Sequence, residues 1–133
     1  MNGRRLPLSR ALVQRIVYAV LRAERRDALI SVTFLGRDSM RRLNAEHKGQ
    51  DRPTDVLTFR LQPPVGPAIG DVYISPWVAR REARARGIPL RQELIRLVVH
   101  GTLHALGRDH PEGHERTRSP MWRRQERYVE ALT

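Results

Sequence analysis

Three histidines near the end of one helical segment constrain this chain more than any other feature. The stretch HGTLHALGRDH, residues 100–110, places histidines at positions i, i+4 and i+10, with Gly107 between the second and the third. Residues four apart lie on one face of a helix, so His100 and His104 can reach the same ion. Glycine readily ends a helix in a left-handed turn, which lets the chain reverse and present His110 from another direction. The pattern therefore predicts a three-histidine metal site.

Such a site favours hydrolysis. Three nitrogen ligands leave one position of a tetrahedral zinc ion open, as in catalytic sites, and zinc lowers the pKa of a bound water to about 7. Gly101 occupies the position at which HExxH zinc peptidases carry their catalytic glutamate, and it provides either clearance at the metal or close packing against a strand. Asp109 is a candidate catalytic residue, as a base or as a partner that orients a ligand histidine; the alternative is an acceptor for backbone N–H groups.

Other residues near this pattern are interpreted as structural. His47 and His114 are predicted to be surface residues rather than metal ligands. Met121 begins an amphipathic helix and is expected in the core, although some zinc peptidases carry a methionine turn after their histidines. Glu93 shares a helical face with His100 but lies about 10 Å away along the axis, too far to replace the missing glutamate.

The spacing of apolar residues predicts an α+β fold, a small mixed β-sheet packed with about five α-helices, in a single domain over residues 1–133. Ser9 is expected near the start of the first helix, and Asp38 or Ser39 is expected to cap the second. The proline- and glycine-rich segment 62–70 is expected to be a mobile loop. The predicted helices cover residues 8–25, 38–46, 76–86, 90–106 and 119–132. The predicted strands cover residues 28–36, 56–61 and 71–75.

The charge of the chain favours a polyanionic partner. Lysine and arginine total 25 against 14 acidic residues, a net charge of +11. Lys48 is the only lysine, so codon composition also accounts for an arginine excess that is spread over both halves of the chain. The chain has no cysteine, which excludes disulfide partners and thiolate metal sites and is compatible with a cytoplasmic location. No run of about 18 apolar residues exists, so no membrane-spanning helix is expected.

Several blocks of this sequence resemble one family. HGTLHALGRDH is similar to the HGxLHLLGxDH signature of the YbeY family, metal-dependent endoribonucleases of ribosome biogenesis. LNAEHKGQDRPTDVLTF, residues 43–59, is similar to the family's LNxxYRGKDxPTDVLSF block, and GDVYIS, residues 70–75, resembles its third block. Met121 falls where family members have a methionine after the histidines. The matching blocks extend from Leu43 to Tyr128 and together are specific.

The resemblance implies a fold, a metal and an activity. It implies one α+β domain with a zinc ion held by His100, His104 and His110. It also implies cleavage of single-stranded RNA, with roles in maturation of the 3′ end of small-subunit rRNA and in rRNA quality control. Single-stranded RNA, rRNA and the small ribosomal subunit are therefore the implied partners. Family members usually open with a strand before the first helix, and here that strand is expected to be absent or very brief.

The second block contributes candidate substrate contacts. The family's arginine in the YRGKD motif corresponds here to Lys48, which implies a catalytic, phosphate-binding role for this lysine. Lysine is a point charge and lacks the two-pronged donor of arginine. Lys48 and Arg52 are the candidate RNA contacts. Pro53, Thr54 and Asp55 are expected to be structural, with the proline setting a turn and the polar side chains satisfying backbone groups.

Three functions are compatible with the sequence. A zinc-dependent endoribonuclease explains the histidines and the charge together. A metallopeptidase fits the histidines but lacks the catalytic glutamate. A non-catalytic ribosome-assembly factor with a structural metal fits the charge equally well, and the sequence does not separate it from the nuclease.

Overall fold

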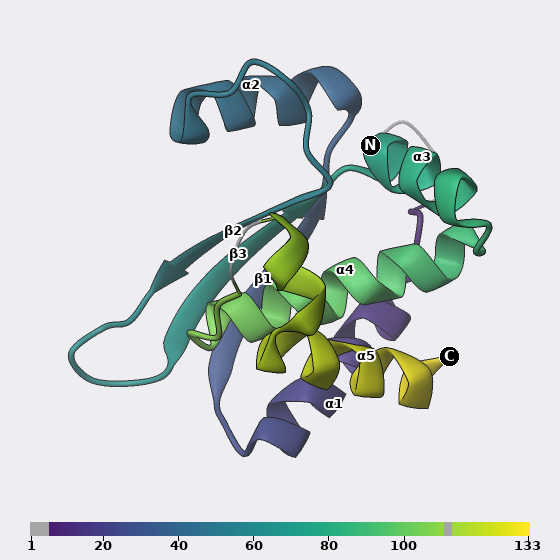
Figure 1. Ribbon diagram of the computed structural model, residues 1–133. Coiled ribbons are helices and arrows are strands. Elements are labelled where there is room, and N and C mark those ends of the chain that lie inside the picture. The colour runs from purple at the N-terminus through teal and green to yellow at the C-terminus, as the bar shows by residue number, and fades with distance from the viewer. Residues whose placement is uncertain (1–5, 111–112) are drawn as a thin grey trace.

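Five α-helices and one three-stranded sheet form the regular structure in the residues that the computed structural model describes, 6–110 and 113–133 (Figure 1). This confirms the predicted α+β class with a mixed sheet. In chain order the elements are α1 (Arg10–Glu24), β1 (Ala28–Phe34), α2 (Arg37–Lys48), β2 (Val56–Leu61), β3 (Ala68–Ile74), α3 (Pro76–Arg86), α4 (Leu90–Ala105), the 3₁₀ helix η1 (Gly113–Arg118) and α5 (Pro120–Leu132).

Of the two helix caps predicted from the sequence, one is confirmed and the other is wrong. The Ser9 hydroxyl accepts a hydrogen bond from the Leu12 N–H at 3.1 Å and caps α1. The prediction that Asp38 or Ser39 caps α2 is wrong. The cap is Gly36, which offers no side-chain bond, and Asp38 lies inside the first turn. A carboxylate in the first turn still stabilises the helix through the helix dipole, so the sequence signal was genuine but displaced by two residues.

The largest difference from the predicted strand boundaries is at the start of β3. β3 begins at Ala68, inside the segment 62–70 that was expected to be a loop. Ala68 and Ile69 pair with Ala28 and Leu29 of β1, so pairing with the neighbouring strand overrides the local glycine and proline signal. No strand precedes α1 in residues 6–9, and residues 1–5 lie outside the described part of the chain.

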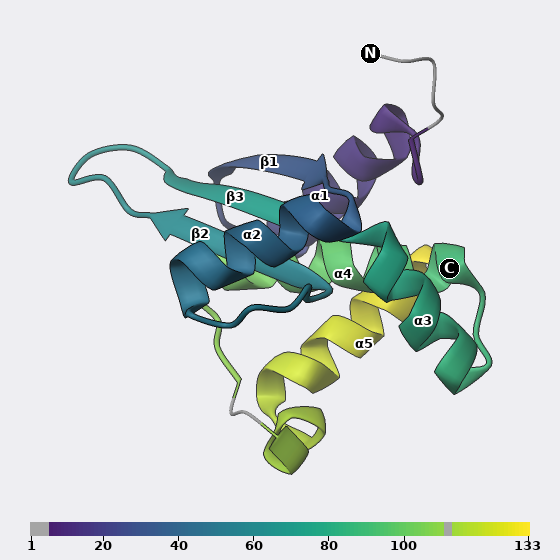
Figure 2. The ribbon, with the colours of Figure 1, turned by 90° about the horizontal axis from the view of Figure 1, so that it is seen from above.

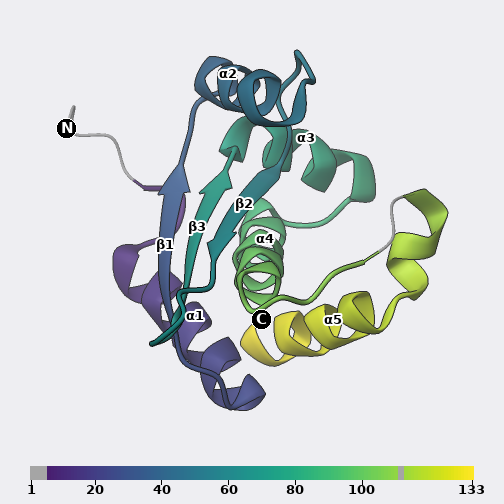
Figure 3. The ribbon, with the colours of Figure 1, turned by 90° about the vertical axis from the view of Figure 1, so that its left-hand side faces the viewer.

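The sheet places β3 at its centre. β3 pairs in parallel with β1 and antiparallel with β2, in the order β1-β3-β2. Figures 1 and 3 show α2 and α3 at one end of the sheet, whereas the β2–β3 connection extends at the opposite end. The two helices follow β1 and β3 directly, so the parallel pair places both of them at the same end.

α4 is the central helix of the fold. It contacts all three strands and also α1, α3 and α5. Figure 2 shows it between the sheet and α5. The core lies along this helix, and Met121 of α5 is buried within it, as predicted. Its fully buried members include Ile16, Val20, Val72, Ile74, Leu94, Ile95, Val98, Val99 and Leu103. Across the described residues, no helix combines the length and apolar character needed to cross a membrane.

Two glycines let α4 lie very close to β3. A Cβ atom at Gly101 would approach the Val72 Cγ1 to 2.4 Å, and one at Gly70 would approach the Ala105 Cβ to 2.4 Å. Contacts this short do not occur between real side chains, so both positions require glycine at this helix–strand separation. Of the two roles predicted for Gly101, the structure supports close packing against a strand.

The end of α4 reverses the chain as predicted. Gly107 has a left-handed φ of 91°, and its N–H donates to the His104 carbonyl at 2.9 Å. The Arg108 N–H donates to the Leu103 carbonyl at 3.0 Å, which completes a Schellman motif. Arg60 adds a hydrogen bond from Nε to the Ala105 carbonyl at 3.1 Å. The residues after Gly107 therefore leave the axis of α4 and turn back toward the histidines of that helix.

Candidate active site

The three histidines of the sequence pattern meet in space. One ring nitrogen from each of His100, His104 and His110 lies within 4.8 Å of the other two, so the group could hold a metal ion. The ring centroids are 4.6 to 5.1 Å apart. All three side chains are half-buried, two on α4 and one beyond the reversal at Gly107. The donor set fits the three-imidazole chemistry of a zinc site.

Gln125 holds the first of these histidines. The His100 Nδ1 lies 2.6 Å from the Gln125 Oε1, and the Gln125 Nε2 donates to the Glu126 Oε2 at 3.0 Å. The amide oxygen is thereby directed at the ring, so Nδ1 carries the proton and Nε2 is left with a lone pair for a metal. Gln125 is only 1% exposed. This role was not predicted from the sequence, although a glutamine in the buried stripe of α5 is a visible signal.

The support of Gln125 continues into buried ion pairs. Arg96 binds Glu126 through two hydrogen bonds, of 2.8 and 2.9 Å, and donates to the Glu93 Oε1 at 2.8 Å. Arg86 lies 3.4 Å from the same Glu93 oxygen. Glu93 is therefore committed to two arginines, and it does not line the histidine cleft. This agrees with the expectation that it does not replace the peptidase glutamate.

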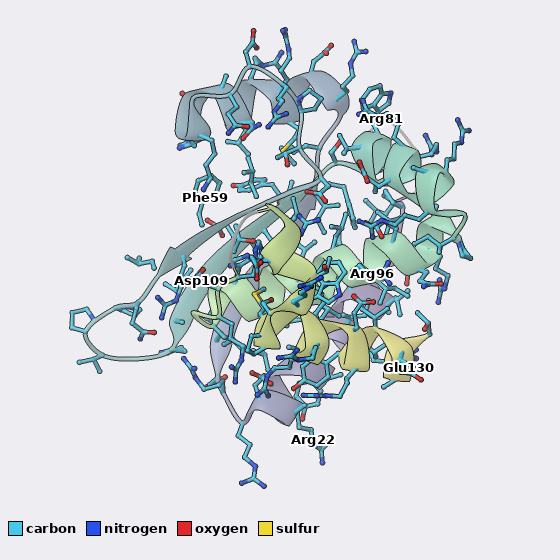
Figure 4. The ribbon with its side chains drawn as sticks, in the orientation of Figure 1. Arg22, Phe59, Arg81, Arg96, Asp109 and Glu130 are labelled. Atoms are coloured by element: carbon cyan, nitrogen blue, oxygen red, sulfur yellow. The ribbon has the colours of Figure 1, made fainter. Side chains whose placement is uncertain are left out.

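Asp109 contacts the second histidine. Its Oδ1 lies 3.3 Å from the His104 Nδ1, and its side chain is 88% exposed. Figure 4 labels Asp109 at this end of α4, with Arg96 further back along the same helix. Of the roles predicted for Asp109, this contact corresponds to a partner that orients a ligand histidine. It again leaves the Nε2 of the ring for a metal.

The loop that carries the third histidine is tied to two helices. Arg108 forms an ion pair with Glu24 of α1, and Arg124 of α5 binds the same carboxylate at 2.8 Å. The Tyr128 hydroxyl also donates to Glu24, whose side chain is 1% exposed. A buried carboxylate with three donors anchors the chain two residues before His110.

The surroundings of His100 and His104 keep these two rings neutral. Burial lowers the pKa of His100 to about 3, and the neighbouring His104 ring adds to the shift. Burial also lowers the pKa of His104, followed by repulsion from His110. Only the neutral imidazole binds a metal, so these two rings are in the ligand form at pH 7 without losing a proton on binding.

The histidines line a cleft of about 880 Å³. Its opposite side is formed by the end of α2 and the loop that follows it. Further basic residues line it from α3 and η1, Arg81, Arg86 and Arg116 among them. Basic residues outnumber acidic ones in this lining, and a cleft of this volume with an excess of positive charge suits a polyanionic ligand. It brings together all six residues singled out from the sequence, namely Lys48, Arg52, His100, His104, Asp109 and His110.

The loop after α2 is held by its own polar groups. The buried Asn44 donates to the Arg52 carbonyl at 2.8 Å. The Asp55 Oδ1 accepts a hydrogen bond from the Val56 N–H at 2.8 Å, which confirms the predicted structural role of that carboxylate. The side chains of Lys48 and Arg52 are exposed, and the Arg52 guanidinium donates to the Gln50 Oε1 at 2.9 and 3.1 Å.

The other two histidines were predicted to be surface residues. His47 is exposed and packs edge-on against Phe59 with ring centroids 4.8 Å apart, so this prediction is confirmed. The side chain of His114 lies outside the described residues. Among the residues described, the only group of three metal-binding side chains is the one at His100.

Comparisons with known proteins agree with the resemblance found in the sequence. The family model described as endoribonuclease YbeY matches residues 6–133. The endoribonuclease YbeY of Thermotoga maritima is 35% identical over 113 residues, which cover 85% of this chain and 73% of that protein. The one from a Sulfurihydrogenibium species is 40% identical over 107 residues, covering 78% and 70%. A solution structure of a Thermotoga maritima protein matches with a TM-score of 0.65 and 32% identity, covering 90% of this chain and 78% of that one.

Proposed function

The chain belongs to the endoribonuclease YbeY family, and we propose that it is a zinc-dependent endoribonuclease that cuts single-stranded RNA in the histidine cleft. The observation that carries this proposal is the meeting of His100, His104 and His110 in a basic cleft of about 880 Å³. A metal site beside positive charge suits a phosphodiester better than a neutral peptide.

The residues of the cleft divide the work of hydrolysis. The three imidazoles would hold a zinc ion, which would supply water activation and Lewis-acid polarisation of a phosphate oxygen. Gln125 and Asp109 fix the ring orientation of His100 and His104 through their Nδ1 atoms. Lys48 places a positive charge in the cleft for a phosphate, and Arg52, further along the loop, contacts the RNA. The exposed Asp109 carboxylate is also available to accept a proton.

The metallopeptidase alternative loses its support in the structure. Position 101 faces Val72 at contact distance, so a glutamate there would be driven into the sheet and away from the metal. Glu93 is held by two arginines. The assembly-factor alternative rests on charge, and part of that charge has structural roles, since Arg96, Arg108 and Arg124 each bind a glutamate.

We further propose that the substrate is ribosomal RNA. Family membership supports a role in maturation of the 3′ end of small-subunit rRNA and in rRNA quality control, with the small ribosomal subunit as partner. A cytoplasmic location and one catalytic domain over residues 1–133 follow from the same proposal. The experiment that tests this substrate asks whether the purified protein shortens 3′-extended small-subunit rRNA in immature subunits.

The central test compares metal content and RNA cleavage in the same preparations. The wild-type protein should carry one transition-metal ion per chain and cut a single-stranded oligonucleotide. His104→Ala should lose both properties while keeping the circular dichroism of the wild type. His47→Ala, an exposed histidine outside the cluster, is the matched control and should keep both. Equal metal content in His104→Ala and wild type would exclude the site, and metal-loaded wild type without cleavage would exclude the nuclease.

A further inference from the structure

One arginine of the cleft forms no side-chain hydrogen bond or ion pair with the residues that the structure describes. Arg116 of η1 lines the histidine cleft and also a small adjoining recess of about 40 Å³ that His100 and Gln125 share. Its Nε is buried and has no hydrogen-bond partner. Leaving a buried charged donor unsatisfied is costly, so such a group is unusual unless a ligand satisfies it.

The contrast with the other half-buried arginines is informative. Arg96, Arg108 and Arg124 each form an ion pair with a glutamate. Within the described residues, no carboxylate forms an ion pair with Arg116. Asp55 is close enough for the guanidinium to lower its pKa, but burial outweighs this effect and raises that pKa. The charge of Arg116 is therefore available to the cleft.

The backbone of Arg116 is fixed by the start of α5. Its carbonyl accepts hydrogen bonds from the Ser119 N–H at 3.2 Å and from the Ser119 hydroxyl at 2.8 Å. The same hydroxyl accepts from the Trp122 N–H at 3.1 Å and caps α5. The guanidinium lies 5.6 Å from the centre of the Trp122 ring, a cation–π distance. Side chain and backbone are thus positioned before any ligand arrives.

We infer that Arg116 is a phosphate-binding residue of the active site. Its guanidinium, which lines the cleft and forms no ion pair with a described carboxylate, can present the two-pronged donor that matches two oxygens of a phosphate. The cleft then holds Lys48 on α2, Arg116 on η1 and the three histidines. Arg116 supplies the forked guanidinium that Lys48 cannot, at the phosphate next to the metal. This inference rests on the proposed nuclease function and names a further residue for it.

The test measures phosphate binding apart from catalysis. Zinc-loaded protein with no free metal is titrated calorimetrically with inorganic phosphate. Arg116→Ala should weaken binding by about tenfold or more, because hydrogen bonds between charged groups are lost. Arg116→Lys should fall between the two, since the charge remains but the fork is lost. Arg118→Ala is the matched control: Arg118 lies on the same 3₁₀ helix, is exposed and does not line the cleft.

Zinc content and RNA cleavage are measured on the same variants. All four proteins should hold equal zinc, and Arg116→Ala should lower kcat/KM where Arg118→Ala does not. Phosphate binding by Arg116→Ala that equals wild type or Arg118→Ala would overturn the inference. So would loss of zinc from Arg116→Ala, which would indicate a structural role, or no phosphate binding by the wild type. If wild type binds phosphate through Arg116 but does not cut RNA, the nuclease proposal fails and this assignment stands.

Discussion

The two walls of the cleft are built in opposite ways. The metal wall consists of His100, His104 and His110, whose rings are half-buried and held from behind by hydrogen-bond partners. The basic wall consists of Lys48 and Arg52, whose side chains are exposed. Metal ligation tolerates only small errors in distance, whereas a point charge acts on a phosphate over several ångströms. The difference teaches that this chain half-buries the groups that need exact geometry and leaves exposed those that need only charge.

This division also has an entropic side. Ordering a lysine or arginine side chain costs up to about 2 kcal/mol of rotamer freedom. The metal wall meets such costs on folding, through core packing and buried ion pairs. On the proposed function, the exposed Lys48 side chain meets this cost when RNA binds, whereas Arg52 is already held by its hydrogen bonds to Gln50. Substitutions on the metal wall should therefore affect metal and stability, and substitutions on the basic wall should affect substrate alone.

The largest effect is expected from the support behind the metal wall. Gln125→Met keeps the volume of the side chain but removes the acceptor for His100 Nδ1, so zinc affinity should fall by about 10–100-fold. Competition with a zinc chelator measures the affinity. Arg127→Met, on the exposed side of α5, is the control and should bind zinc like wild type. Unchanged affinity in Gln125→Met would show that the His100 ring needs no partner to keep its orientation.

The next largest effect is expected at the contact between Gly101 and Val72, which sets the position of the helix that bears the metal wall. Gly101→Ala should lower the free energy of unfolding by about 1–3 kcal/mol, since overpacking at the buried Val72 outweighs the better helix propensity of alanine. Urea unfolding of the metal-free protein measures this. Adding Val72→Ala should recover part of the loss relative to Val72→Ala alone. A Gly101→Ala protein as stable as wild type would mean that α4 can move away from β3 freely.

A moderate effect is expected on the basic wall. Lys48→Ala should lower the rate of RNA cleavage by about tenfold and leave zinc content unchanged, because a charge-assisted contact to phosphate is lost. Lys48→Arg should keep or raise the rate, since guanidinium adds a second hydrogen bond. Arg42→Ala, exposed on the same helix and outside the cleft lining, is the control. Cleavage by Lys48→Ala at the wild-type rate would make the loop purely structural.

The smallest effect is expected at Arg52, where it appears as a salt dependence. The logarithm of RNA affinity should fall with the logarithm of salt with a slope near −0.7 per phosphate contacted, and Arg52→Ala should reduce that slope by about 0.7. Binding to a single-stranded oligonucleotide at several salt concentrations measures this. An identical slope in both proteins would place Arg52 off the path of the RNA.

The metal wall could be predicted from the sequence because its pattern is local. Two histidines one turn apart and a glycine at the reversal are enough to bring His100, His104 and His110 together, and the structure places them within 4.8 Å. The supports of that wall could not be predicted in the same way. Gln125 reaches His100 across 25 residues, and Arg108 reaches Glu24 across 84. Such contacts depend on how helices pack, which spacing along one segment does not define.

The fold shows the same limit. Helices with a clear apolar stripe were located to within about two residues, which is the usual uncertainty of helix ends. The early start of β3 at Ala68 arises because pairing with β1 decides that boundary, and the wrong cap at Asp38 arises where Leu35 still pairs with Ile74 of β3 just before α2. For Gly101, local reasoning left two roles equal, and only the distance to Val72 separated them.

Gly101 and Val72 share one small space, so substitutions at the two positions should be correlated in evolution. A chain that acquires a side chain at 101 keeps its helix in place only if the residue at 72 becomes smaller in the same lineage. Relatives with alanine or serine at the position of Gly101 should therefore carry alanine or glycine opposite it on the strand. The close packing between the two positions also affects which reaction the neighbouring histidine site can acquire. A lineage that acquires the peptidase glutamate at 101 passes through variants in which α4 packs less well. Packing therefore disfavours the change of this site into a zinc-peptidase site.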